Sequence, residues 1–305
     1  MVPVKVLVPD DLGLDLPATT DGTTMAFYHP GEPWPPDHLD ADVVVVGFDN
    51  AAATGARFAD LPNLRLVQTL NAGYEQWVPH LPPGVVLSNG RGAHGGSTAE
   101  WVMAALLSIY RKLPLFRDLQ ADGVWGFQET ETLIGKRIVV LGAGDLAVNL
   151  AARLAPFEAD VTLLGRTARP GVAALADVDE LLPDADAVVA MLPATEETHH
   201  LLDAAFLSRL RDGAVVVNAG RGSAVDTDAL LAELASGRLR AALDVTEPEP
   251  LPPGHPLWSA PNLLLTPHVA GSTEGAWGRA WRVAREQIAV YAAGGRPPNA
   301  VAGPD

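Results

Sequence analysis

Short runs of β-branched residues alternate along this chain with stretches rich in alanine and leucine. The runs at 4–8 and 43–46 are almost wholly apolar, as strands are when helices cover both faces of a parallel sheet. The alternation therefore predicts an α/β protein with parallel sheets. The predicted strands are 4–8, 25–28, 42–46, 64–69 and 85–88 in the first third, then 137–141, 161–164, 187–191, 214–218, 241–245 and 263–266.

A long helical stretch separates two blocks of strands. It covers 97–112, with apolar residues at helical spacing, and a polar segment at 120–132 follows, interpreted as a linker or loop. The six strands after Gly135 are what a dinucleotide-binding fold requires. One more helix passes through Trp277 and Ile288 before a tail rich in glycine and proline.

Charge and cysteine content exclude several classes of protein. The 305 residues include 21 Lys and Arg against 37 Asp and Glu, so the net charge is −16. Such an acidic chain argues against nucleic acid or an anionic membrane as a partner. The chain has no cysteine, which excludes disulfides and thiol nucleophiles. No apolar run is long enough for a membrane span, and no signal-peptide pattern follows Met1, so we expect a soluble, cytoplasmic protein.

A glycine-rich turn follows the first strand of the second block. Gly142 and Gly144 come directly after that strand, with Ala147 at the third position of a G-x-G-x-x-A sequence and Leu146 on the helix that follows. Such glycines let the backbone approach a pyrophosphate at a helix N-terminus. An ordinary tight turn is the alternative, but the strand and helix around it favour dinucleotide binding. Asp145 is expected to point away from the phosphates.

The end of the next strand bears on the choice between NAD and NADP. An acidic residue there would bind the ribose 2′-hydroxyl, but the chain has Arg166 and Thr167, with Arg169 nearby. An arginine at this point suits a 2′-phosphate, and a solvated surface arginine is the alternative. The missing acid and the cation both favour NADP over NAD.

Three further segments lie at predicted strand ends, where open α/β sheets bind ligands. Asn218-Ala-Gly-Arg-Gly contains Arg221, the next contains Asp244, Glu247 and Glu249, and the third contains His268. Arginine suits a carboxylate or a polarised carbonyl, and histidine suits proton transfer near neutral pH. A carboxylate beside that histidine would orient it and favour its protonated form. Each residue alone has an ordinary structural explanation, but together on one sheet they indicate a catalytic site.

These segments, in this order, resemble the D-isomer-specific 2-hydroxyacid dehydrogenases. The similarity extends from about Val85 to Thr273 and includes Leu243-Asp-Val-Thr-Glu-Pro-Glu-Pro-Leu and Leu265-Thr-Pro-His-Val-Ala-Gly-Ser-Thr. The resemblance implies a Rossmann dinucleotide-binding domain at 97–270, inserted into a flavodoxin-like substrate domain formed by 1–96 and 271–305. It also implies hydride transfer between a nicotinamide and a small 2-keto or D-2-hydroxy acid, no metal, and a homodimer.

The same resemblance implies roles for individual residues. Arg221 would bind the substrate carboxylate and keto oxygen, His268 would be the general acid and base, and Glu249 would be its partner. Glu247 is the rival, but the family's acid stands five residues after the aspartate, here Asp244. The backbone of Asn71, Ala72 and Gly73 would hold the substrate carboxylate. The cofactor would contact Gly142, Gly144, Asp145, Leu146, Arg166, Thr167, Leu192, Pro193, Thr198, Asn218, Ala219, Gly220, Asp244, His268, Ala270 and Gly271.

Three functions are compatible with the sequence. The first is an NADP-preferring reductase of glyoxylate or hydroxypyruvate. The second is an NAD-linked phosphoglycerate-type dehydrogenase, distinguished by the cofactor's 2′ position and by a cationic pocket for a substrate phosphate. The third is a dinucleotide-sensing corepressor, which would bind cofactor without turning over any 2-keto acid.

Overall fold

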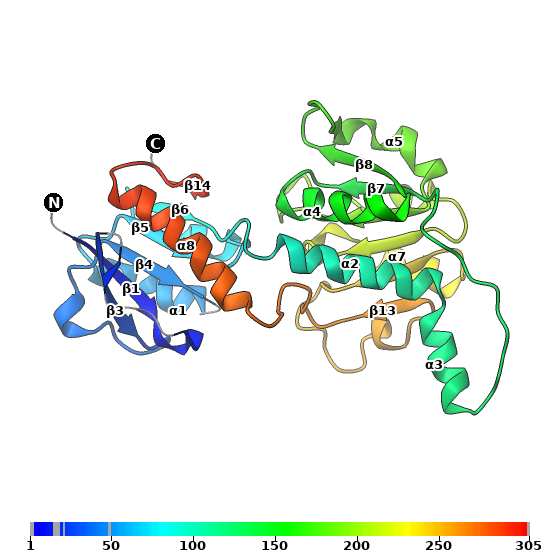
Figure 1. Cartoon of the computed structure of the whole chain (residues 1–305), viewed down its shortest axis with the longest axis horizontal. Coiled ribbons are helices and arrows are strands. Elements are labelled where there is room, and N and C mark those ends of the chain that lie inside the picture. Colours follow the sequence, from blue (N-terminus) through cyan, green and yellow to red (C-terminus); the bar gives the residue numbers. More distant parts are fainter. Residues whose placement is uncertain (1–2, 15–18, 21, 48–49, 304–305) are drawn as a thin grey trace. The chain divides into compact units, whose positions relative to one another are not determined.

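The computed structural model describes residues 3–14, 19–20, 22–47 and 50–303. The chain forms two compact units, Met1–His94 with Glu274–Asp305, and Gly95–Thr273, so it leaves the first unit and returns to it. In Figure 1 the blue to cyan N-terminal segment and the red C-terminal segment together form the first unit, and the chain between them in sequence forms the second. The assignment of a substrate domain and a cofactor domain to these parts of the chain stays a prediction.

The first unit is a flavodoxin-like parallel sheet with an antiparallel strand at each edge. Its order is β14-β6-β5-β4-β1-β3-β2. The five inner strands, taken in chain order, have the order 2-1-3-4-5 of doubly wound flavodoxin-like sheets. The strands are β1 (Val4–Pro9), β2 (Thr19–Thr20), β3 (Thr23–Tyr28), β4 (Val43–Val46), β5 (Leu66–Thr69), β6 (Val86–Ser88) and β14 (Ala300–Ala302).

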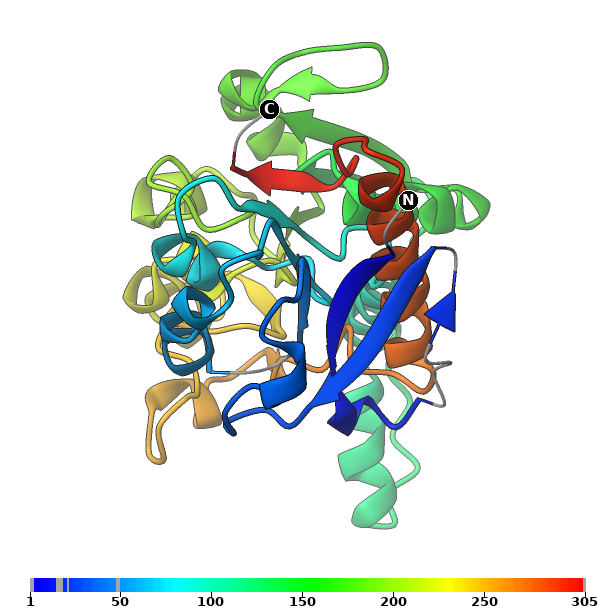
Figure 2. The ribbon, with the colours of Figure 1, turned by 90° about the vertical axis from the view of Figure 1, so that its left-hand side faces the viewer.

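Apolar layers cover both faces of this sheet. Helix α8 (Ala276–Ala292) covers one face, where Trp281 and Ile288 pack against the strands (Figures 1 and 2). The other face carries α1 (Ala51–Ala56) and an aromatic cluster of Trp34, Phe58 and Trp77. Burial on both faces explains why the early strands are nearly continuous apolar runs.

The second unit is a Rossmann-type sheet whose strands are all parallel. Its order is β13-β12-β11-β10-β7-β8-β9, so the strand order reverses between β7 and β10. An α/β fold of this kind is what the alternating sequence predicted. The strands are β7 (Arg137–Leu141), β8 (Asp160–Gly165), β9 (Ala173–Ala174), β10 (Ala187–Ala190), β11 (Val215–Asn218), β12 (Arg240–Leu243) and β13 (Leu263–Leu265).

Helices lie on both faces of the second sheet. On one face α2 (Gly95–Tyr110) and α4 (Asp145–Leu154) bury Leu106 and Leu150 against the strands. On the other face lie α5 (Val178–Leu181), α6 (Ala204–Ser208) and α7 (Thr227–Ala235). Among the described residues, no helix combines the length and apolarity needed to cross a membrane.

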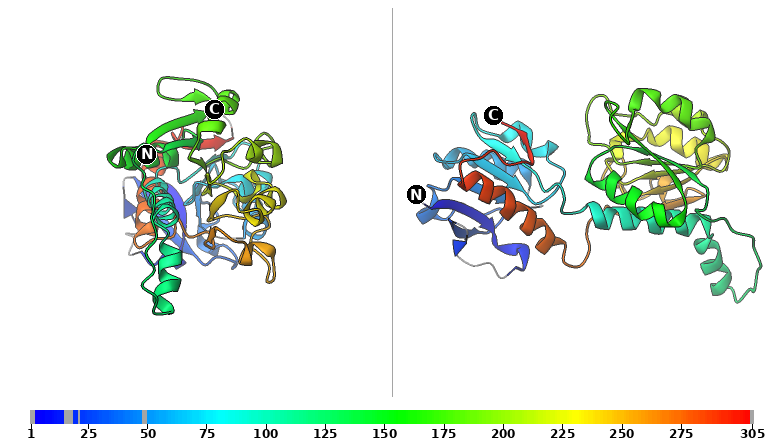
Figure 3. Two further views of the ribbon diagram at one scale, coloured as in Figure 1. Left: turned by 90° about the vertical axis from the view of Figure 1, so that its right-hand side faces the viewer. Right: turned by 45° about the horizontal axis from the view of Figure 1, so that its top comes forward.

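All eleven predicted strands are present, with ends that differ by at most two residues. The sequence analysis missed the short edge strands β2, β9 and β14 and the helix α3 (Leu113–Ala121). Helix α2 ends at Tyr110, Lys112 has a left-handed φ of 51°, and Pro114 lies in the first turn of α3. Proline is tolerated in a first turn, so here it starts a new helix after the predicted one. Helix α3 and the loop after it extend away from the unit (Figure 3).

Asp186 is a buried ion-pair centre at the start of β10. Its carboxylate accepts the backbone N–H of Arg137 at 2.8 Å and lies 3.2 Å from the Lys136 ammonium, with Arg211 as a further partner. Asp184, two residues earlier, pairs with the side chain of Arg137, but its own side chain is 72% exposed. The two aspartates therefore offer a matched comparison of buried and exposed ion pairs.

We expect Asp186→Ala to lower the free energy of unfolding by about 3 kcal/mol, because it removes the acceptor of the Arg137 N–H and breaks the buried pair with Lys136, which keeps Glu131 as a partner. Asp184→Ala should cost less than about 1 kcal/mol, since water screens the exposed pair. Urea unfolding followed by circular dichroism measures both variants. Equal losses in the two variants would contradict this account of the ion pairs at the start of β10.

Candidate active site

The carboxyl ends of the parallel strands in the second unit meet at one edge of the sheet. Open α/β sheets bind their ligands outside this edge, near the point where the strand order reverses. The residues directly after β7, β8, β10, β11, β12 and β13 are Gly142, Arg166, Met191, Ala219, Asp244 and Thr266. Most of the predicted cofactor residues and all three predicted catalytic residues follow these strand ends.

The glycine-rich turn between β7 and α4 allows close backbone contact. Gly142 has φ of 125°, and a Cβ built there would lie 2.6 Å from the carbonyl oxygen of Met191. Gly144 is the residue before α4, and no side chain caps that end of the helix. Leu146 lies on the first turn. N–H groups without a side-chain cap, next to a turn made of Gly142, Ala143 and Gly144, fit a phosphate group.

Asp145 turns toward α2. Its Oδ1 accepts a hydrogen bond from Asn149 at 3.0 Å, and its buried Oδ2 would lie 2.0 Å from a Cβ at Gly95. Packing against the first residue of α2 accounts for the position of this carboxylate. That Asp145 points away from a bound pyrophosphate stays a prediction.

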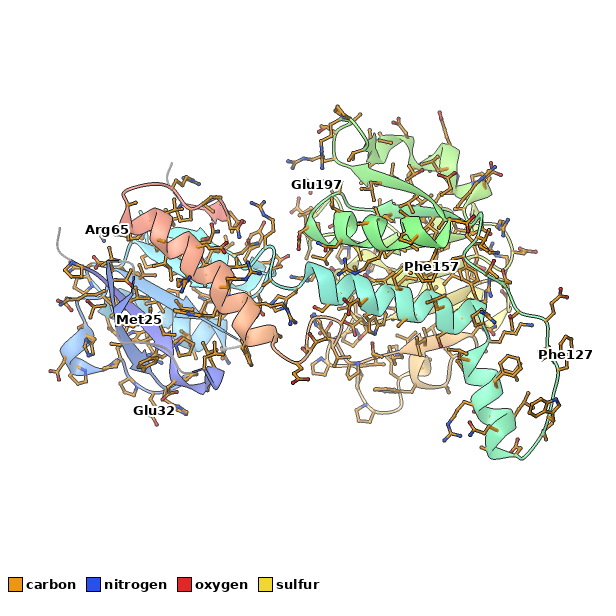
Figure 4. All side chains as sticks on the ribbon, in the orientation of Figure 1. Met25, Glu32, Arg65, Phe127, Phe157 and Glu197 are labelled. Atoms are coloured by element: carbon orange, nitrogen blue, oxygen red, sulfur yellow. The ribbon has the colours of Figure 1, made fainter. Side chains whose placement is uncertain are left out.

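Two arginines follow β8. Arg169 donates from Nη2 to the carbonyl of Ala143, within the glycine-rich turn, at 2.9 Å. Arg166 is exposed, and its charge is one of the influences that lower the pKa of Glu197, after the hydrogen bond with Thr195. Glu197 lies on the loop after β10 (Figure 4). A cationic segment thus lies beside the turn where an adenosine ribose would be expected.

A second loop closes by internal hydrogen bonds after β10. Thr198 is buried, its hydroxyl donates to the carbonyl of Pro193 at 2.6 Å, and it accepts the N–H of Thr195 at 2.9 Å. Leu192, at the start of this loop, is also buried. The structure therefore gives Thr198 a loop-closing role that its residue type alone did not indicate.

Asn218 shapes the loop that carries Arg221. Its fully buried side chain accepts the N–H of Gly220 at 3.1 Å and donates to the carbonyl of Arg221 at 2.9 Å. A Cβ at Gly220 would lie 2.7 Å from the backbone nitrogen of Leu192, and one at Gly222 would meet the Thr246 carbonyl at 1.9 Å. Close backbone packing explains why the loop contains glycine on each side of the arginine.

Asp244 holds the segment that carries His268. Its side chain is buried, and it accepts the hydroxyl of Thr266 at 2.6 Å and the N–H groups of Val269 and Ala270 at 2.8 and 2.9 Å. Its carbonyl accepts the N–H of His268 at 2.7 Å. His268 has a left-handed φ of 53°, a conformation that such a dense set of hydrogen bonds can hold. The sequence analysis did not predict this positioning role.

His268 and Glu249 form a close pair. His268 Nδ1 lies 2.5 Å from Glu249 Oε1, and the two side chains are 51% and 38% exposed. The hydrogen bond with Glu249, helped by the charges of Glu249 and Asp244, raises the pKa of His268 against the opposing effects of burial and Arg221. Burial raises the pKa of Glu249, but the hydrogen bond and charge of His268, with Arg221, outweigh it and lower the pKa overall. The pair therefore favours an imidazolium beside a carboxylate.

Glu247, the rival of Glu249, points to another histidine. Its Oε2 lies 2.8 Å from Nε2 of His200. The structure therefore brings Glu249 to His268, and it places Glu247 elsewhere.

The predicted substrate loop belongs to the first unit. It follows β5, where the carbonyls of Asn71 and Ala72 accept hydrogen bonds from Gly90 N–H and the Asn89 side chain, both at 2.8 Å. Gly73 continues this loop. These contacts fix the backbone of the loop within its own unit.

The chain is similar to known proteins of one family. Residues 103–270, more than half of the chain, match the family model described as D-isomer specific 2-hydroxyacid dehydrogenase, NAD binding domain. A glyoxylate/hydroxypyruvate reductase B from Citrobacter koseri is 36% identical, covering 70% of each chain. A glyoxylate reductase from Thermofilum pendens is 32% identical, over 79% of this chain and 75% of that protein.

A solved structure agrees with these sequence matches. The D-isomer specific 2-hydroxyacid dehydrogenase from Xanthobacter autotrophicus Py2, in complex with NADPH and MES, has a TM-score of 0.83 and 32% identity, covering 97% of this chain and 98% of that one. The chain therefore belongs to the D-isomer specific 2-hydroxyacid dehydrogenase family. It is an NAD(P)-dependent oxidoreductase of 2-hydroxy and 2-keto acids, and the predicted family is confirmed.

The His268–Glu249 pair predicts a specific pH dependence. Reduction of a keto acid consumes a proton. We expect protonated His268 to supply it, so the raised pKa of His268 should extend activity to higher pH. Glu249→Gln removes the anionic acceptor, so the pKa of His268 falls and the alkaline limb of kcat/KM for reduction moves to lower pH.

Glu247→Gln is the matched control, because it removes another histidine-bound carboxylate two residues away. We expect its pH profile to match the wild type. A shift in Glu247→Gln together with an unchanged profile in Glu249→Gln would transfer the role to Glu247.

Proposed function

We propose that this protein reduces a small 2-keto acid of the glyoxylate or hydroxypyruvate type, with NADPH as the preferred cofactor. The observation that carries the proposal is the His268–Glu249 pair, at 2.5 Å, on the sheet edge that also carries Arg221. Relatives named glyoxylate reductase and glyoxylate/hydroxypyruvate reductase B support the substrate class. Nothing favours a phosphorylated substrate over these small acids.

The residues of the pair have complementary tasks. Glu249 occupies Nδ1 of His268, so Nε2 is the nitrogen left to give a proton to the keto oxygen. Arg221 binds the substrate carboxylate and polarises the carbonyl, since its planar guanidinium matches both. Asn218 and Asp244 hold the two loops in place.

We place the cofactor at the same sheet edge, beside the turn between β7 and α4. The glycine-rich turn with Gly142 and Gly144 leaves room for a pyrophosphate beside α4. A bound nicotinamide supplies hydride to the substrate C2. Ala219, Ala270 and Gly271 lie at the same strand ends and would border the cofactor.

Replacement of the catalytic residues tests the function. His268→Ala should lower kcat for glyoxylate reduction by about 10²–10⁴, because the proton donor is lost, and leave NADPH affinity near that of the wild type. Arg221→Lys should lose most turnover, because an ammonium cannot form a bidentate fork. Stopped-flow NADPH oxidation and fluorescence titration of NADPH measure the two properties.

His29→Ala is the control, because His29 also pairs with a carboxylate, Asp10, at 2.9 Å in the first unit. Near-native kcat/KM in Arg221→Lys would refute the substrate-binding role. Tight NADPH binding by the wild type without turnover of any 2-keto acid in a panel would instead indicate a dinucleotide sensor.

We infer the preference for NADPH from the segment after β8. Arg166 is exposed there, Thr167 follows it, and Arg169 contacts Ala143 of the glycine-rich turn. A charge-assisted pair between Arg166 and a 2′-phosphate would contribute about 1.5–3 kcal/mol. This corresponds to about a ten- to hundredfold preference.

Arg166→Ala should therefore reduce kcat/KM for NADPH by about ten- to a hundredfold and leave that for NADH nearly unchanged. Arg209→Ala, which removes an exposed arginine paired with Asp179, is the control. Gly165→Asp is a poorer test, because a Cβ there would lie 3.0 Å from Val172 Cγ1. Both cofactors are compared at one ionic strength. A wild-type preference for NADH would refute the proposal.

We expect the protein in the cytoplasm. We also propose that it forms a homodimer with a second copy of the chain. The arm formed by α3 and residues 122–134 carries exposed apolar side chains: Trp125 is 101% and Phe127 90% exposed. Figure 4 shows Phe127 on this arm. Apolar patches of this kind mark protein interfaces. Sedimentation velocity should show a dimer for the wild type and for Trp258→Ser, and a monomer for the Trp125→Ser/Phe127→Ser variant. A monomeric wild type would contradict the proposal.

A further inference from the structure

Three side chains with metal-binding atoms meet in the second unit, apart from the His268–Glu249 pair. His199, His200 and Glu247 each offer one nitrogen or oxygen, and these atoms all lie within 4.8 Å of one another. The closest contact joins His200 Nε2 and Glu247 Oε2 at 2.8 Å. The rings of His199 and His200 stack with centroids 4.0 Å apart and planes at 25°.

The backbone explains how two consecutive histidines come to face the same way. In an extended chain, neighbouring side chains point to opposite sides. Here His200 has a left-handed φ of 49°, which brings its ring over that of His199. The N–H of His200 donates to the carbonyl of Ser223 at 2.7 Å, and the N–H of His199 donates to the carbonyl of Thr195 at 3.0 Å. Backbone hydrogen bonds therefore hold both histidines of the turn. Strained positions of this kind are often found at functional sites.

Glu247 is presented by a separate segment, the one after β12. Its carbonyl accepts the hydroxyl of Thr227 at 3.0 Å, which ties this segment to the start of α7. The side chains of His200 and Glu247 are 40% and 41% exposed. An ion can therefore reach all three groups directly from solvent.

We propose that His199, His200 and Glu247 form a binding site for a divalent transition-metal ion of the zinc or nickel type. Two imidazoles and one carboxylate suit these ions, whereas magnesium and calcium prefer oxygen ligands alone. With metal–ligand bonds of about 2.0–2.1 Å, tetrahedral donors lie about 3.3 Å apart. Small side-chain rotations bring the three donors to this spacing, and water completes the coordination.

A plain hydrogen bond between His200 and Glu247 is the competing explanation. It accounts for the 2.8 Å contact between His200 and Glu247, but it does not involve the stacked ring of His199. The two explanations differ in one measurable property. A metal site requires His199, whereas the hydrogen bond does not.

Isothermal titration calorimetry of chelator-treated, tag-free protein with ZnCl₂ tests the proposal. We expect one zinc ion per chain, no comparable heat with MgCl₂, and at least about tenfold weaker zinc binding in each of His199→Asn, His200→Asn and Glu247→Gln. Zinc should also raise Tm in the wild type and not in the His199→Asn/His200→Asn variant.

His268→Asn and Glu249→Gln remove the other histidine–glutamate pair of the unit and serve as the matched controls. Zinc binding retained in both controls supports the proposed site. Binding that is lost in these controls but kept in His200→Asn would place the ion at the His268–Glu249 pair and overturn the proposal. Equal binding by the wild type and the double histidine variant would overturn it as well.

Discussion

The candidate site depends on one buried carboxylate. Asp244, directly after β12, accepts three hydrogen bonds from the segment after β13 and so joins two neighbouring strand ends. Those bonds hold the left-handed turn at His268, and the turn directs its ring to Glu249. Without this anchor, an exposed loop would have to place a catalytic histidine by itself. A buried acceptor with its partners in place restrains this loop.

Close backbone packing completes the arrangement. Gly142, Gly220 and Gly222 each lie where a Cβ would meet the backbone of a neighbouring loop. The glycine-rich turn after β7, the loop that carries Arg221 and the segment after β12 therefore pack together along one edge of the sheet. The same edge carries the proposed dinucleotide site and the His268–Glu249 pair, so hydride and proton would reach adjacent atoms of one substrate.

Much of the fold follows from sequence pattern, because strands buried on both faces are continuous apolar runs such as Val43–Val46. Short edge strands such as β9 leave no such pattern, and Pro114 concealed the start of α3. The site was predicted by residue types at strand ends together with family resemblance. The resemblance selected Glu249 over Glu247 by its spacing from Asp244, and the structure has Glu249 in contact with His268. How Asp244 holds the loop depends on a left-handed turn and on tertiary contacts that residue spacing does not reveal.

The central claim is that Asp244 places His268 against Glu249. An NMR titration of the His268 ring in the wild type and in Asp244→Asn measures this directly. We predict a wild-type pKa above the ordinary value of about 6.5, because Glu249 stabilises the imidazolium. In the variant the pKa should fall toward that value, since the negative charge of Asp244 is lost, an amide cannot accept all three hydrogen bonds, and the turn relaxes. An unchanged pKa of His268 in Asp244→Asn would contradict the account.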